Sequence, residues 1–178
     1  FMWRTGDTIQ HASGPGYEAV DLPYGGGAFS MTVLLPDPGV SLEAVVEGLG
    51  PETWSGLVDS FAPTRLDLAL PRFEMAYARQ LNEDLRQLGM TAAFDPEQAD
   101  FSRLSSKMRL YLSDVRHKAW VRVDEEGTRA AAATSVGASF TSAPPTFLVD
   151  RPFLFALREH LSGTILFLGK VVDTGASD

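Results

Sequence analysis

The chain contains no cysteine, so disulfide bonds and cysteine-based metal sites are excluded, while the redox compartment stays open. It has no basic run interleaved with aromatic residues, and its formal net charge is −8, so we do not expect a nucleic-acid partner. No apolar run approaches the roughly 18 residues of a membrane-spanning helix, and no membrane partner is expected. The rest of the composition is typical of globular proteins. With 178 residues, of which 44% are hydrophobic, the chain is long enough to form one sizeable core.

Motifs for catalysis are missing as well. The histidines His11, His117 and His160 are isolated, and no H-E-x-x-H or G-x-S-x-G pattern occurs. The glycine run 25–27 is not followed by the Lys-Ser/Thr that a phosphate-binding loop needs. Acidic pairs fall where solvated loops and strand ends are expected. We therefore predict that the chain is not an enzyme and that it binds no metal and no cofactor.

The spacing of apolar residues predicts a chain of short strands and helices. The expected elements are short strands in 1–35 with a hairpin of 17–24 and 29–35, two helices in 41–61 divided at Gly50-Pro51, strands in 65–77 bent at Pro71, a helix over 81–88, a strand over 110–124, and strands buried on both faces at 147–157 and 164–172. Residues 90–108 are expected to be irregular, residues 174–178 are expected to fray, and no repeat or second domain is expected.

The stretch 125–145, EEGTRAAAATSVGASFTSAPP, has the composition of a linker but the alternation of a strand. Between Thr128 and Thr141, the even-numbered positions carry the large apolar residues, and the odd-numbered positions carry the only charge, Arg129. A strand with an inner and an outer face has this pattern. The segment is thus suited to be an exposed loop in one state and a buried strand in another.

EEGTRAAAATSV resembles the hinge of the serpins, serine protease inhibitors whose reactive loop inserts into their own sheet. FLVDRPFLFALREHLSGTILFLGKV resembles the C-terminal signature of that family, and LDLALPRFEM, LGMTAAF, ADFS and LSDVRHKAWVRVDEEGT follow in the family's order. The resemblance implies an α+β serpin fold with mixed β-sheets and short helices. It also implies that residues 1–178 are the C-terminal portion of a single serpin domain, without its N-terminal helices and several main-sheet strands. Such a piece alone is not expected to inhibit.

The resemblance further implies a reactive loop over about 127–145. Its hinge residues would be Glu125, Glu126, Gly127, Thr128, Ala130, Ala131, Ala132, Ala133 and Thr134. The register places the scissile bond at Thr141–Ser142, with Phe140 and Thr141 setting specificity. A small neutral Thr141 favours an elastase-like or subtilisin-like target; a register one residue shorter would present Phe140 to a chymotrypsin-like enzyme.

Two residues outside the loop also match family positions. Arg72 is expected to pair with Glu125 where the loop begins to insert, and His117 corresponds to a histidine at the centre of the sheet, where strands part. Many inhibitory members have Glu where this chain has Arg129, on the outer face.

The implied mechanism traps the protease as an acyl-enzyme while the cleaved loop inserts. The alternative is a non-inhibitory serpin that acts as a binding or carrier protein or as a simple substrate. The family also implies a monomer at full length and an extracellular or cell-envelope location.

Overall fold

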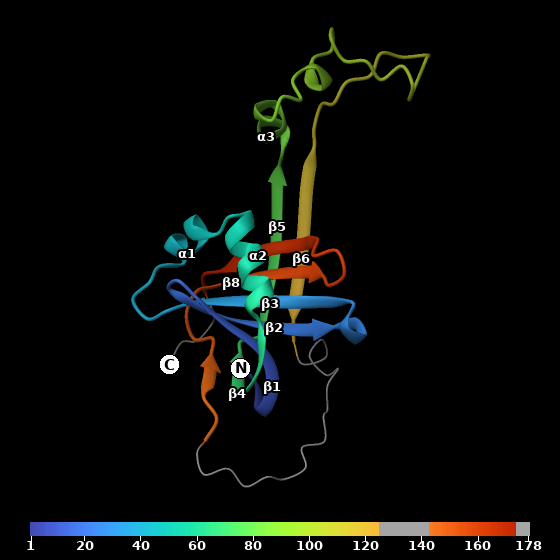
Figure 1. Cartoon of the computed structure of the whole chain (residues 1–178). Helices are drawn as coiled ribbons and strands as arrows, with labels where there is room; N and C mark the ends of the chain where they lie inside the picture. The colour runs from blue at the N-terminus through green and yellow to red at the C-terminus, as the bar shows by residue number, and fades with distance from the viewer. Residues whose placement is uncertain (125–142, 174–178) are drawn as a thin grey trace. The chain divides into compact units, whose positions relative to one another are not determined.

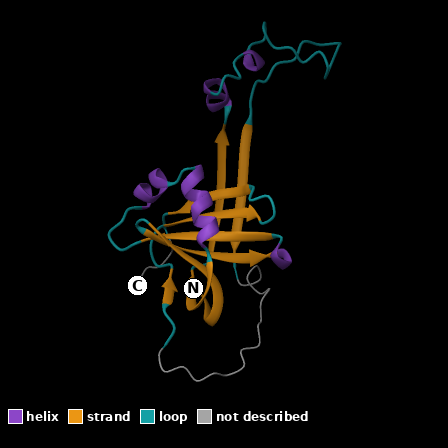
Figure 2. Ribbon diagram, in the orientation of Figure 1, coloured by secondary structure: helices purple, strands orange, loops and turns teal. Residues whose placement is uncertain are grey.

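Strands dominate this computed structural model, as Figure 2 shows. The structure describes residues 1–124 and 143–173, and the structural statements below concern these ranges. The chain divides into two compact units, one of Phe1–Phe73 with Val123–Asp178 and the other of Glu74–Arg122. Each unit is described by itself.

The first unit is built on a seven-stranded sheet in the order β7-β4-β1-β2-β3-β8-β9. Its strands are β1 (Met2–Gly14), β2 (Tyr17–Tyr24), β3 (Phe29–Pro36), β4 (Ala62–Leu70), β7 (Thr146–Leu148), β8 (Phe153–Glu159) and β9 (Ile165–Val171). β7 pairs with β4 in parallel, and the other neighbours are antiparallel. β7 and β9 are therefore the two edges (Figure 1).

The predicted hairpin is confirmed, because β2 and β3 pair from Tyr17 opposite Pro36 to Tyr24 opposite Phe29. The connection is a short 3-10 turn, η1 (Gly25–Gly27), whose glycines have φ of 57°, 68° and 94°. Residues that have a side chain rarely adopt these backbone angles, so the turn requires glycine. Val20, Val33 and Leu34 are fully buried, so the hairpin forms the centre of the core.

The two predicted helices are also confirmed, as α1 (Leu42–Gly48) and α2 (Pro51–Ser60). The Ser41 hydroxyl accepts a hydrogen bond from the Ala44 amide at 3.1 Å, as expected of an N-cap. Leu42, Val45 and Leu57 pack in one cluster with residues of β1, β2, β3 and β8. The predicted stripe fails at Val46, which is 42% exposed.

The C-terminal strands differ from the prediction. The expected strand 147–157 is interrupted between Leu148 and Phe153, and the two parts become β7 and β8 at different places in the sheet. β8 is buried as predicted, but β9 is exposed along most of its length, with Leu168 61% exposed. The predicted strand at 164–172 is confirmed, but its predicted burial was wrong because β9 lies at an edge of the sheet in the described part of the chain.

The second unit holds most of a two-stranded sheet of β5 (Phe73–Gln80) and β6 (Arg116–Val123). The first residue of β5, Phe73, and the last residue of β6, Val123, belong to the first unit. The prediction of a bend at Pro71 is confirmed, but the expected strand 110–124 is shorter than predicted and starts at Arg116. α3 (Asn82–Gln87) and the 3-10 turn η2 (Ala92–Phe94) follow β5. No helix within the described residues is long and apolar enough to cross a bilayer.

Candidate functional site

The predicted reactive loop falls mostly outside the described residues. The predictions that lie there concern Glu125, Glu126, Gly127, Thr128, Arg129, Ala130, Ala131, Ala132, Ala133, Thr134, Phe140, Thr141 and Ser142. The described flanks of this segment are Asp124, directly after β6, and Ala143, shortly before β7. The candidate site is therefore characterised through the residues that hold these two flanks.

The C-terminal flank is attached to the edge of the large sheet. The carbonyl of Pro145 accepts a hydrogen bond from the Asp67 amide at 2.9 Å, and the Val149 amide donates to the carbonyl of Ala69 at 2.9 Å. Between these bonds β7 runs parallel to β4, and the side chain of Phe147 is buried. The His11 ring meets the Phe147 ring edge to face, with centroids 6.2 Å apart. The chain beyond Ala143 is thus held by backbone bonds and by one aromatic anchor.

A bulge in β1 supports the same contact. The register of β1 against β4 shifts between Arg4 and Asp7, and Gly6 within this bulge has φ of 64°. The Gly6 amide donates to Asp67 Oδ1 at 2.6 Å, and Arg65 Nε donates to the Gly6 carbonyl at 3.3 Å. Sequence reasoning missed Asp67. Its signal was a single acidic residue within the apolar alternation of 66–70.

Arg72, the predicted partner of the hinge, lies at the junction of β4 and β5. Its neighbours Pro71 and Phe73 are buried, and the Phe73 ring contacts those of Phe153 and Phe155 at centroid distances of 5.6 and 5.3 Å. These neighbours hold the backbone, and the Arg72 side chain between them is exposed. Its predicted partner Glu125 is outside the described residues, and the ion pair stays a prediction.

The other predicted sheet residue, His117, lies on β6 in the second unit and is exposed. Its ring is 6.2 Å from that of Tyr77 on β5. A hydrogen bond with Tyr77 raises the pKa of Arg79, and the nearby Asp84 carboxylate adds to this shift. The structure therefore brings His117 to the surface of the two-stranded sheet, and its role in sheet opening stays a prediction.

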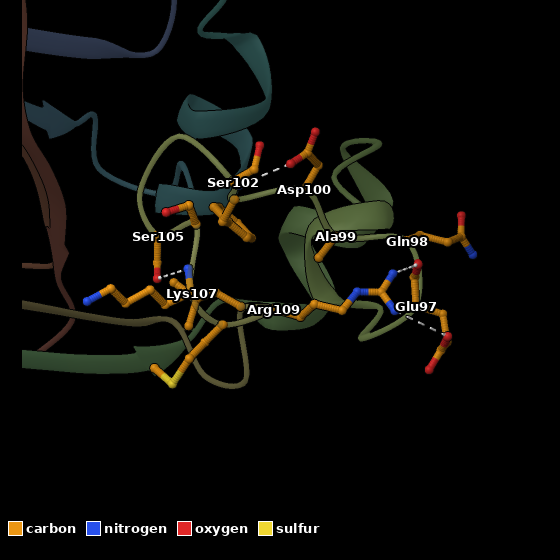
Figure 3. A pocket seen from close by; sticks show the side chains of 12 residues that line it. Glu97, Gln98, Ala99, Asp100, Ser102, Ser105, Lys107 and Arg109 are labelled. Atoms are coloured by element: carbon orange, nitrogen blue, oxygen red, sulfur yellow. Dashed lines mark hydrogen bonds and ion pairs between the residues drawn. The ribbon is translucent and has the colours of Figure 1, made fainter.

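A polar hollow of about 430 Å³ lies within the second unit, and residues 97–102 and 105–110 line it (Figure 3). Arg109 donates to the Glu97 carbonyl at 3.1 Å, and the Ser102 amide donates to Asp100 Oδ1 at 3.0 Å. Hydrogen bonding by Ser102 lowers the pKa of Asp100. These contacts close the segment upon itself, and none of the predicted site residues lines the hollow.

An apolar groove of about 470 Å³ lies in the first unit, between the α1–α2 connection and strands β8 and β9. Val46, Leu49, Trp54, Ile165 and Leu168 line much of it. The groove has no titratable side chain in its lining, so it offers burial of apolar surface rather than chemistry. Across the described ranges, no three potential metal-ligating residues of the types His, Cys, Asp or Glu gather in one place.

Comparison with known proteins identifies the class. A family model described as "Serpin (serine protease inhibitor)" matches residues 1–174. The chain is 37% identical over 171 residues to glia-derived nexin of Mus musculus, covering 96% of this chain and 43% of that protein. It is 38% identical over 161 residues to plasminogen activator inhibitor 1 of Sus scrofa, covering 88% and 39% respectively. The crystal structure of tengpin, a thermophilic serpin, in its native state matches with a TM-score of 0.75 and 32% identity, over 96% of this chain and 45% of that one.

These matches and the mixed sheets with short helices define an α+β serpin fold. The chain belongs to the serpin family. It spans less than half the length of these relatives. The family description and the name plasminogen activator inhibitor 1 both denote inhibitors rather than enzymes. From the sequence we likewise expected a protein that is not an enzyme.

Proposed function

We propose that the protein containing this chain inhibits a serine endopeptidase by acting as a suicide substrate. The observation that supports the proposal most is the order along the chain: segment 125–142 follows strand β6 and precedes strand β7, in a chain of the serpin family. A bait loop needs an extended backbone beyond the cut. Pro144-Pro145 and the Pro145–Asp67 bond favour such a backbone.

The proposed chemistry takes place in the protease. Its serine attacks the carbonyl of Thr141, the Thr141–Ser142 bond breaks, and an acyl-enzyme forms. The freed loop, with Thr128 to Phe140 alternating between inner and outer face, then enters the main sheet as a strand. The protease active site is distorted, deacylation stalls, and one inhibitor molecule is consumed for each protease molecule.

The target class follows from the residue at the cut. Thr141 is neutral and small, which suits elastase-like or subtilisin-like pockets and disfavours a trypsin-like pocket that needs a cation. A cut after Phe140 would instead fit a chymotrypsin-like enzyme. We further propose that Arg72 pairs with Glu125 at the hinge, that His117 lies where the sheet parts, and that residues 1–178 are the C-terminal portion of the serpin domain.

The test is to incubate the full-length protein with elastase, subtilisin and chymotrypsin and to look for a complex that survives SDS. The proposal expects a complex and a new amino terminus at Ser142, determined by mass spectrometry. A Thr141→Arg variant should shift the preference toward trypsin and serves as the specificity control. Clean cleavage by all three enzymes, with no complex, would establish the alternative of a non-inhibitory serpin that is only a substrate.

A further inference from the structure

We propose that Asp67 is a positioning residue, which holds the C-terminal stem of the reactive loop against the large sheet through the β1 bulge. This inference rests on the proposed function for its consequence, but its geometry lies within the described residues. The stem consists of residues 143–148, which follow the proposed scissile bond.

Asp67 contacts both the stem and the bulge. Its amide donates to the Pro145 carbonyl at 2.9 Å, and its carboxylate accepts from the Gly6 amide at 2.6 Å. A carboxylate that accepts a backbone N–H makes a charge-assisted bond, stronger than a neutral one. The backbone of Asp67 is therefore tied to β1 on one side while it carries the first bond to the stem on the other.

The bulge is shaped for this contact. The positive φ of 64° at Gly6 suits glycine, and a Cβ there would lie 3.2 Å from Nη2 of Arg65. Bulges re-aim backbone groups, and this one points the Gly6 amide at Asp67 instead of into the β1–β4 ladder.

Apart from the buried Phe147 ring and the ladder to β4, the stem is a short strand. β7 has three residues and lies at the edge of the sheet, so β4 is its partner strand there. Short edge strands open at a low free energy, well below that of global unfolding. The Asp67–Pro145 bond is thus placed to decide how often the stem leaves the sheet, and with it the tension on the bait loop.

Hydrogen exchange of the full-length protein tests this without any protease. Asp67→Ala should raise the exchange rate of the amides in 146–149 by about tenfold, because one charge-assisted bond is lost, while 153–159 in β8 stay unchanged. Asp67→Asn keeps an acceptor oxygen and should recover most of the protection. Gly6→Ala should reproduce the selective effect through the bulge.

Ile9→Val is the matched control, since it weakens buried packing on β1 without touching Asp67. It should lower the free energy of unfolding without a selective effect on 146–149. Equal acceleration of 146–149 and 153–159 in Asp67→Ala, or no acceleration of either, would overturn the positioning role. Absence of an SDS-stable complex in the wild-type protein would instead remove the proposed function, and the exchange result would stand.

Discussion

At the scale of single residues, three buried polar side chains join three strands of the large sheet. Arg158 Nη2 donates to Asp21 Oδ2 at 2.7 Å, and the Thr32 hydroxyl donates to Asp21 Oδ1 at 2.6 Å. Arg158 and Asp21 are only 4% and 6% exposed. A charge buried this deeply is tolerated because it is paired, so the removal of one partner leaves a desolvated charge behind.

Arg158→Ala should therefore lower the free energy of unfolding by about 3–5 kcal/mol, measured by urea denaturation. A double replacement, Asp21→Leu with Arg158→Leu, should recover much of the loss, since no unpaired charge remains. Arg79→Ala removes an exposed pair with Asp84 and should leave the free energy of unfolding nearly unchanged, because water screens exposed ion pairs. If Arg158→Ala changed the free energy of unfolding as little as Arg79→Ala, that result would contradict the importance of the buried pair.

Glu159 carries a pH dependence at the turn between β8 and β9. Hydrogen bonds from Ser162 and the Leu161 amide to its carboxylate lower its pKa from the ordinary 4.5. A lowered pKa in the folded state means that the stabilisation is present above the ordinary value and is lost as the pH falls through the folded value.

The amides of Leu161 and Ser162 should therefore lose protection against hydrogen exchange, and approach their intrinsic rates, as the pH falls from 4.5 through the lowered pKa of Glu159. The Glu159→Gln variant lacks the titration and should show no such change. Hydrogen exchange followed by NMR measures both. An identical pH profile for the two proteins would show that Glu159 does not hold the turn.

At the scale of elements, the sequence predicted what local chemistry decides. Ser41 and Gly50-Pro51 mark the ends of the helices, and Gly25–Gly27 marks the hairpin. Prediction failed where the burial or position of a strand depends on which strand it pairs with. The apolar run of β9 does not reveal that β9 is an edge strand in the described chain, and the run 147–157 does not reveal that its two halves pair with different strands. Of the candidate site, the loop was predicted from its alternation and its resemblance to the serpin hinge, and it lies outside the described residues. Asp67 was missed because it contacts a bulge that has no periodic signal.

The pairing of β8 with β9 includes a close approach that explains a glycine. Gly169 lies opposite Phe155, and a Cβ there would come within 2.7 Å of the Phe155 ring. Gly169→Ala should lower the free energy of unfolding by about 1–3 kcal/mol through overpacking, and a second change, Phe155→Leu, should relieve part of that strain. Thermal unfolding monitored by circular dichroism measures the difference.

Gly56→Ala is the matched control for this variant. Gly56 lies in α2, and a Cβ there would have no atom within 4 Å. The same substitution should therefore stabilise the protein, by about 0.5–1 kcal/mol from helix propensity. Equal signs for the two alanine variants would mean that the Phe155 contact does not explain Gly169.

At the scale of the whole molecule, loop insertion requires a strand on each side of the inserted one. β5 and β6 form a two-stranded sheet in the described chain, and this chain spans less than half of the relatives that it matches. We therefore expect residues 1–178 alone to be cleaved by the target protease without a stable complex. Complex formation by this piece would contradict the need for further strands.

The central proposal is that the loop inserts with its even-numbered side chains inward. The most direct measurement compares two neighbouring variants of the full-length protein, Ala132→Glu on the inner face and Ala131→Glu on the outer face, by the amount of inhibitor consumed for each protease molecule trapped. Burying an unpaired carboxylate opposes insertion, so Ala132→Glu should be cleaved as a substrate with at least about tenfold more inhibitor consumed, while Ala131→Glu should trap nearly as well as the wild type. Equal trapping by the two variants would contradict insertion of the loop in this register.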